Sequence, residues 1–248
     1  RDNPFFSMFH AIARLHIGYL QGDAPQALAA VMAVRRSAHQ LTGMIWSVLF
    51  DVWGSLTLAA CIEHAADAQQ RDDWLAQMRE SLASLAVLAR SSAANFRCHW
   101  LLLDAELERI GGRQDAALDR YEQAIAQADE AGDVQQQALA NELFAAFWLG
   151  RGNRGIAALY LRAALAHYRA WGAQAKVRQM LDRHGDLLGA ASAPAKPAVG
   201  FESLDVATIV KAAHAVAETV EREPLLERRL QIASENAGAR RGLQRDRG

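Results

Sequence analysis

The feature that most constrains the fold is a turn glycine followed by apolar residues at fixed offsets, a pattern that occurs three times. The three glycines are Gly22, Gly112 and Gly152. In each segment a small residue stands five positions after the glycine, and further apolar residues stand at nine and twelve: Ala27, Val31 and Val34; Ala117, Tyr121 and Ala124; Ala157, Leu161 and Ala164. These offsets lie on one helix face, which predicts close packing against the preceding helix.

The repetition predicts an all-α fold of stacked helix pairs, a TPR-like α-solenoid over residues 1–188. The second helix of each pair matches the tetratricopeptide pattern, whereas the first helices keep only the small residues Ala105 and Ala145. Gly112 and Gly152 are 152 − 112 = 40 positions apart, which exceeds the roughly 34 residues of the tetratricopeptide repeat. We therefore expect helix pairs of irregular length.

The 90 positions from Gly22 to Gly112 leave room for two pairs, each of about 45 residues. The intervening pair has Arg-Asp-Asp at residues 71–73 instead of a turn glycine. Cap residues Asp23, Asp133 and Asn153 and a helix-ending Gly132 support the boundaries. We expect helices and no strands, with the helices at residues 5–20, 24–38, 41–67, 70–89, 92–110, 113–131, 133–151, 153–170 and 173–184.

The composition changes at the end of the predicted solenoid. Residues 189–203 are rich in Ala, Gly and Pro, which predicts a flexible linker. Helices resume in residues 204–248, at about 204–221 and 224–237. The first of them carries an apolar seam from Val206 to Val220, which predicts either a parallel coiled-coil homodimer through residues 204–221 or packing on a further domain.

Charge and cysteine content exclude several classes of partner. The formal net charge is −1, so the chain has no general attraction for nucleic acid or anionic lipid. Cys61 and Cys98 lack the spacing of a disulfide framework and indicate free thiols in the cytoplasm. The chain shows no signal-peptide pattern and opens at Arg1 without a Met, so we expect it to begin inside a longer protein.

Residues 44–62 are nearly long and apolar enough to span a membrane. However, Asp51 would lie near the bilayer centre, at a cost of about 2.5–3.5 kcal/mol. Trp46 and Trp53 lie inside the stretch rather than at its edges. We therefore predict a buried helix and no membrane partner.

No catalytic, cofactor-binding or metal-ligating residues are predicted. The glycine-rich residues 150–155 lack the Lys of a phosphate loop and are interpreted as a repeat turn. Glu63-His64 lacks the Pro of a phosphoacceptor motif, and the spacing of His10 and His16 puts them on different helix faces. Cys98 and His99 are likewise interpreted as structural.

Two patterns leave a functional alternative open. Asp104, Glu106 and Glu108 alternate along a helix and could serve a hydrolase, although an exposed helix face explains them equally well. Aromatic residues gather near the predicted last repeat and form either a peptide-binding groove or, as we favour, the repeat core: Phe144, Phe147, Trp148, Tyr160, Tyr168 and Trp171. The C-terminal arginines interleave with glutamates and are interpreted as a solvated terminus.

Two stretches carry a resemblance to a known family. The first comprises residues 141–149, 158–161, Tyr168 and 171–177, and it resembles the last helical repeat of large multi-domain bacterial signalling kinases. The second comprises residues 203–212, 225–227 and 235–239, and it looks like the helix leading into the GAF domain of that family. These proteins join a Ser/Thr-kinase-like domain, a STAND/AAA-type ATPase, helical repeats, a GAF domain and a histidine kinase.

The resemblance implies a function for the chain as a segment of such a protein. Residues 1–188 would be a non-catalytic regulatory scaffold that couples sensor and kinase modules, with other domains of the same protein or protein ligands as partners. Residues 204–248 would be a signalling helix and the truncated start of a GAF domain, since no apolar GAF strands follow Leu243. The alternatives are a STAND-type transcription regulator, which residues 203–241 argue against, or a dimerisation element.

Overall fold

The computed structural model describes residues 4–36 and 44–189. The chain divides into two units, Arg1–Ala193 and Pro194–Gly248. All described residues belong to the first unit. The predicted linker starts at Gly189, which is the last residue of the final described helix. The rest of the linker prediction and the predictions for the helices at 204–221 and 224–237, including the homodimer, lie outside the described residues.

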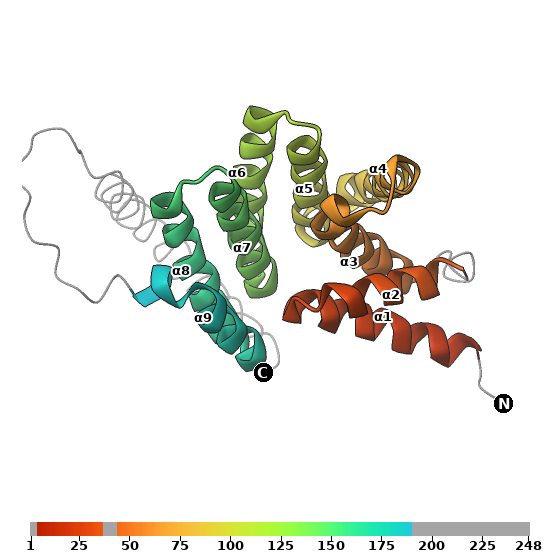
Figure 1. The fold of residues 1–248 in the computed structure, drawn as a ribbon, viewed down its shortest axis with the longest axis horizontal. Helices are drawn as coiled ribbons and strands as arrows, with labels where there is room; N and C mark the ends of the chain where they lie inside the picture. Colours follow the sequence, from red (N-terminus) through yellow and green to blue (C-terminus); the bar gives the residue numbers. More distant parts are fainter. Residues whose placement is uncertain (1–3, 37–43, 190–248) are drawn as a thin grey trace, which may run out of the picture. The chain divides into compact units, whose positions relative to one another are not determined.

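Over the described residues the chain is all-α, as predicted, and its helices pack mostly as sequential antiparallel pairs (Figure 1). A short 3-10 helix, Ile62–His64, follows the third α-helix. The α-helices are α1 (Pro4–Gln21), α2 (Ala24–Arg35), α3 (Ile45–Cys61), α4 (Ala68–Ser91), α5 (Ala93–Ile110), α6 (Gln114–Ala131), α7 (Val134–Gly150), α8 (Arg154–Trp171) and α9 (Gln174–Gly189).

The predicted turns and caps are confirmed. Gly22, Gly112 and Gly152 adopt φ values of 70°, 77° and 75° between the two helices of their pairs, a region that favours glycine because it has no Cβ. The side chains of Asp23, Asp133 and Asn153 accept hydrogen bonds from backbone N–H groups in the first turns of α2, α7 and α8. These caps satisfy donors that the helix itself leaves without partners.

Several predicted boundaries are wrong. Helix α2 ends at Arg35 instead of residue 38, and α3 begins at Ile45 instead of residue 41. The turn of the second pair lies at residues 65–67, and residues 71–73 are inside α4. The cause is Asp67, whose carboxylate caps α4 by accepting from the Gln70 N–H at 2.8 Å, whereas the sequence interpretation put it inside a helix. Helix α9 also differs from the prediction, since it continues past a kink at His184 to Gly189 instead of ending at 184.

The small residues at the repeated offset lie in the helix-pair interfaces, as predicted. Ala117 and Ala157 are completely buried, and Ala27 is 1 % exposed. Gly18 on α1 contributes to the same interface, since a Cβ added there would lie 3.2 Å from the backbone nitrogen of Ala27. Val31, Tyr121 and Leu161 are buried one turn further along, so the repeated pattern sets the spacing of each pair.

Helix α3 is a core helix of this array. It contacts α1, α2, α4 and α5, and most of its residues are buried. Ile45–His64 is the one stretch among the described residues that is long and apolar enough to cross a membrane, and 61 % of its most apolar window is buried inside the structure. Asp51 within it accepts a hydrogen bond from the Ser81 hydroxyl on α4 at 2.9 Å.

The first helices of successive pairs form an inner layer. Helix α1 contacts α3, α3 contacts α5, and α5 contacts α7. Helix α1 also contacts α9, so the ends of the described array meet. At that junction a Cβ on Gly22 would lie 2.7 Å from Nε2 of Gln179 on α9. The odd-numbered helices therefore surround a common space, and this space holds the candidate site.

Candidate functional site

Two adjoining cavities lie between the odd-numbered helices. One has a volume of about 370 Å³ and is lined by residues of α1, α3, α5, α6 and α7 and by Arg151, which follows α7. The other has a volume of about 380 Å³ and extends to the start of α2, the 3-10 helix and α9. Tyr19, Ala60, Leu143 and Ala146 line both cavities. We call the combined space the inner groove.

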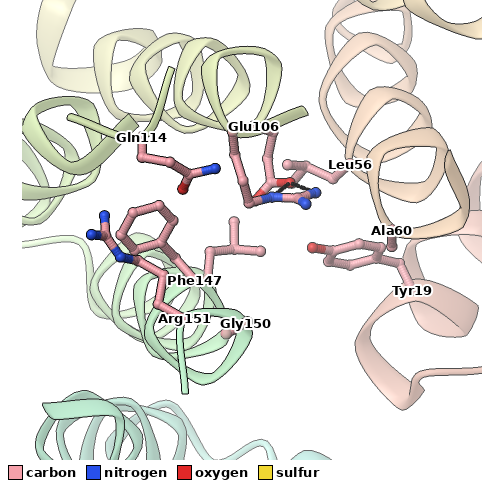
Figure 2. Close-up of a pocket in the computed structure, with 11 residues that line it drawn as sticks. Tyr19, Leu56, Ala60, Glu106, Gln114, Phe147, Gly150 and Arg151 are labelled. Atoms are coloured by element: carbon pink, nitrogen blue, oxygen red, sulfur yellow. Dashed lines mark hydrogen bonds and ion pairs between the residues drawn. The ribbon is translucent and has the colours of Figure 1, made fainter. Parts of the chain in front are cut away.

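Small side chains keep the inner groove open. Ala60 on α3 and Ala146 on α7 are both exposed, although their neighbours on the same helices are mostly buried. Figure 2 shows the Tyr19 hydroxyl and the Gln114 amide pointing into the cavity from different helices, with Phe147 and Arg151 on a further side. The groove thus combines apolar surface with hydrogen-bonding groups on its walls.

The first charged cluster of the groove is Glu106, Arg109 and Tyr121. The Tyr121 hydroxyl donates to one oxygen of Glu106 at 2.5 Å, and Arg109 Nη2 donates to the other at 2.5 Å. The Glu106 side chain is 7 % exposed and that of Arg109 is 30 % exposed. Burial and the neighbouring carboxylate raise the pKa of Tyr121 well above its usual value. The phenol therefore stays protonated and acts as a donor.

The second charged cluster is Glu142, Lys176 and Tyr168, and it joins three consecutive helices. Lys176 Nζ on α9 lies 2.6 Å from one oxygen of Glu142 on α7. The Tyr168 hydroxyl on α8 donates to the other oxygen at 2.7 Å, and the ammonium also lies 5.6 Å from the centre of the Tyr168 ring. In this cluster the cation is the more buried partner, since Lys176 is 7 % and Glu142 is 24 % exposed.

Tyr19 on α1 lies near both carboxylates. Burial raises its pKa well above the ordinary value, with further contributions from Glu142 and Glu106 and an opposing one from Arg109. Its hydroxyl is consequently a protonated donor that faces the groove between the two clusters (Figure 2). A ligand carbonyl or carboxylate in the groove would find a donor here.

A separate polar site, away from the groove linings, contains two imidazoles. His16 on α1 stacks on Trp53 of α3 with ring centroids 4.0 Å apart, and its Nε2 lies 3.4 Å from Nε2 of Gln135 on α7. Burial and the nearby His99 lower the pKa of His16 to about 4. Burial also lowers the pKa of His99, against raising contributions from a backbone hydrogen bond with Asn95 and from Asp133. Both rings are therefore neutral at pH 7 and act as packing groups.

The carboxylates singled out in the sequence do not form one site. Asp104 pairs with Arg120 at 2.6 Å, Glu106 pairs with Arg109, and Glu108 pairs with Arg113. Glu106 is buried, and the side chains of Asp104 and Glu108 are only 15 % and 19 % exposed, so the interpretation of the three as an exposed helix face is wrong. The burial results from Tyr121 on α6, whose hydroxyl reaches Glu106 across the helix pair.

The structure also locates the other residues that the sequence analysis considered as functional candidates. Of the six aromatic residues predicted to form the repeat core, Phe144, Phe147 and Tyr168 are buried, although Phe147 also lines the groove. Trp148 and Tyr160 are half-buried, and the prediction is wrong for Trp171, which is 39 % exposed. Residues 150–155 span the α7–α8 turn, as predicted, with the turn itself at residues 151–153. His10 and His64 are exposed, and Cys98 is buried. No group of three or more His, Cys, Asp or Glu side chains with metal-binding geometry occurs in residues 4–36 and 44–189.

The sequence interpretation missed the groove residues Tyr19, Glu142 and Lys176. Glu142 and Lys176 are 34 positions apart and meet only because α9 packs beside the preceding pair. Tyr19 joins them because α1 returns to α9. A buried Lys on an otherwise amphipathic α9 is a weak sequence signal, since Lys is almost never fully buried without a partner.

No family model matches this chain, and no curated protein or solved structure matches it significantly. The resemblance to bacterial signalling kinases therefore stays a prediction from the two stretches within residues 141–177 and 203–239. The class of protein that fold and groove define is a helical-repeat array with an internal groove.

Proposed function

We propose that the described helices form a non-catalytic interaction module that holds an extended peptide segment in the inner groove. The observation that carries this proposal is the open space between the odd-numbered helices, where exposed Ala60 and Ala146 leave room for side chains of a partner. An extended peptide brings backbone N–H and C=O groups that need partners when buried. Tyr19, Gln114 and Gln179 supply such partners from the groove walls.

The chemistry of the groove supports binding over catalysis. Its two carboxylates, Glu106 and Glu142, each accept from a tyrosine and a cation at once. A general base needs a free lone pair near the operating pH and a proton to abstract within reach. Carboxylates held in this way are suited to fixing the positions of the surrounding helices.

The proposed context is a bacterial signal-transduction ATPase/histidine kinase, in which the module would couple sensor and kinase domains. The support for this context is the resemblance of the two stretches within residues 141–177 and 203–239 alone. The partner in the groove would then be another segment of the same large protein or a separate protein ligand. Stacked helix pairs suit such a role because they build a continuous binding surface.

A peptide-display selection against the full chain tests the binding function. We expect enriched peptides whose binding to Ala146→Trp, measured by fluorescence anisotropy, is at least about tenfold weaker, because the indole fills the groove. The matched control is Ala166→Trp on α8, an exposed alanine that lines neither groove cavity, and it should bind like the unmodified chain. Failure to enrich any peptide, or unchanged binding by Ala146→Trp, would contradict the proposal.

A further inference from the structure

The charges that line the inner groove do not cancel. Its two carboxylates, Glu106 and Glu142, are each ion-paired to a cation that also lines the groove, Arg109 and Lys176 respectively. Two further arginines, Arg151 and Arg183, line the groove, and both are exposed. Neither forms an ion pair with any of the residues that the structure describes.

Arg151 is held in position by two aromatic rings. Its guanidinium carbon lies 5.5 Å from the ring centres of both Phe147 and Trp148. Stacking on an aromatic face uses the flat side of a guanidinium and leaves its N–H donors free in the plane. Those donors match the two oxygens of a carboxylate. Arg151 lies at the edge of the groove, on the far side of the Phe147 ring from Tyr19 (Figure 2), where it can donate to an anionic partner.

Arg183 stands on α9, at the junction where α9 meets the α1–α2 turn. Its Nη1 would be 4.0 Å from a Cβ at Gly22, next to Gln179. A shallow cavity beside it adds Arg178 and Asp182, and the charges of these two cancel. The groove therefore keeps an excess of two positive charges, one on the α7 side and one on the α9 side.

We propose that the partner of the inner groove is an acidic peptide segment and that Arg151 and Arg183 recognise its carboxylates. This proposal rests on the proposed peptide-binding function and adds the chemistry of the peptide. Charge complementarity favours it, since an acidic residue at either end would meet a guanidinium, whereas a basic segment would meet two like charges. A nucleic acid is disfavoured, since two cations neutralise few phosphates and the net charge of the chain is −1.

The test is a pair of peptide-display selections on the full chain, one with the native sequence and one with Arg151→Gln/Arg183→Gln. Peptides selected by the native chain should be enriched in Asp and Glu, and the variant should lose that enrichment. For the strongest native binder, we expect Arg151→Gln and Arg183→Gln each to weaken binding about threefold, and both together about tenfold. Raising the salt concentration should weaken the native complex more than the variant complex.

The matched control is Arg79→Gln/Arg169→Gln, which removes two exposed arginines that line neither cavity and should leave binding unchanged. Enriched peptides without acidic bias, or equal binding by Arg151→Gln/Arg183→Gln, would overturn this inference and leave the peptide-binding function standing. Failure to enrich any peptide would overturn both. A 12-nucleotide single-stranded DNA that displaces the selected peptide at equal concentration would overturn the choice of an acidic peptide.

Discussion

The two charged clusters beside the groove contain the same three kinds of group but bury opposite charges. In the first, the carboxylate of Glu106 is buried and Arg109 reaches solvent. In the second, the ammonium of Lys176 is buried and Glu142 is the more exposed partner. The first cluster lies within one helix pair, while the second joins α7, α8 and α9. The free energy of unfolding that a mutation removes should therefore depend on which partner of the ion pair it removes.

The largest expected effect is that of Glu142→Leu. It leaves the buried Lys176 ammonium without its carboxylate, and removing one partner of a buried pair costs about 3–5 kcal/mol. Lys176→Met should cost less, because the carboxylate left behind is partly exposed and still accepts from Tyr168. Urea denaturation followed by circular dichroism measures both. The double variant Glu142→Leu/Lys176→Met should recover most of the loss in stability. Equal losses for the two single variants would contradict the predicted difference between the two partners.

The site formed by His16 and His99 can be compared with the two charged clusters, since it is a buried polar site without an ion pair. The pKa of His16 falls from 6.5 to about 4 on folding, so between these values the unfolded chain binds a proton that the folded chain does not. Folding stability should therefore decrease as the pH falls from about 7 to 4, by about 3 kcal/mol in total. Denaturation midpoints across this range measure the slope. In His16→Phe, which keeps the stacking on Trp53, an unchanged slope would count against this assignment.

Arg109→Met tests the first cluster and should cost about 2 kcal/mol, because it leaves a buried carboxylate that keeps only the Tyr121 hydroxyl. Glu106→Gln should cost less, since the remaining guanidinium is 30 % exposed and reaches water. The order is thus reversed relative to the second cluster, where removal of the acid is the more damaging change. The same denaturation experiment measures the stability of both variants, and an Arg109→Met variant more stable than Glu106→Gln would contradict the account.

The smallest effect belongs to an ion pair outside both clusters, Arg154 with Asp186. Both side chains are more than 60 % exposed, so the gain in Coulomb energy is offset by solvent screening and by the loss of side-chain freedom. Arg154→Ala should change the free energy of unfolding by less than about 0.5 kcal/mol. A loss of stability as large as that of Arg109→Met would show that burial does not determine how much an ion pair contributes to the free energy of unfolding.

Local signals predicted most of the fold. The glycines at the turns, the alanines at the interfaces and the caps Asp23, Asp133 and Asn153 each act within a few residues, and all of them lie where the sequence placed them. The error at the α3–α4 turn arose where two local interpretations competed. Asp67 fits both a helix interior and a helix cap, and its position was decided by the hydrogen bond to the Gln70 N–H.

The inner groove could not be predicted in the same way. It depends on contacts between residues that are far apart in the chain, such as Glu142 with Lys176, and on the return of α1 to α9. The proximity of His16 to His99 has the same origin. Such contacts follow from small rotations added at each helix pair, and no local pattern encodes their sum. The sequence could therefore indicate stacked helices but not which side chains face the common space.

The most direct test of the central claim, that a partner peptide lies in the inner groove, is photo-crosslinking from its wall. A benzophenone attached to Gln179→Cys labels that site selectively, since Cys61 and Cys98 are buried and burial raises the pKa of both thiols. On irradiation the label should capture the peptide obtained by selection, whereas the same label on Ala166→Cys of α8 should not. Equal capture from both positions, or capture from Ala166→Cys alone, would contradict the account.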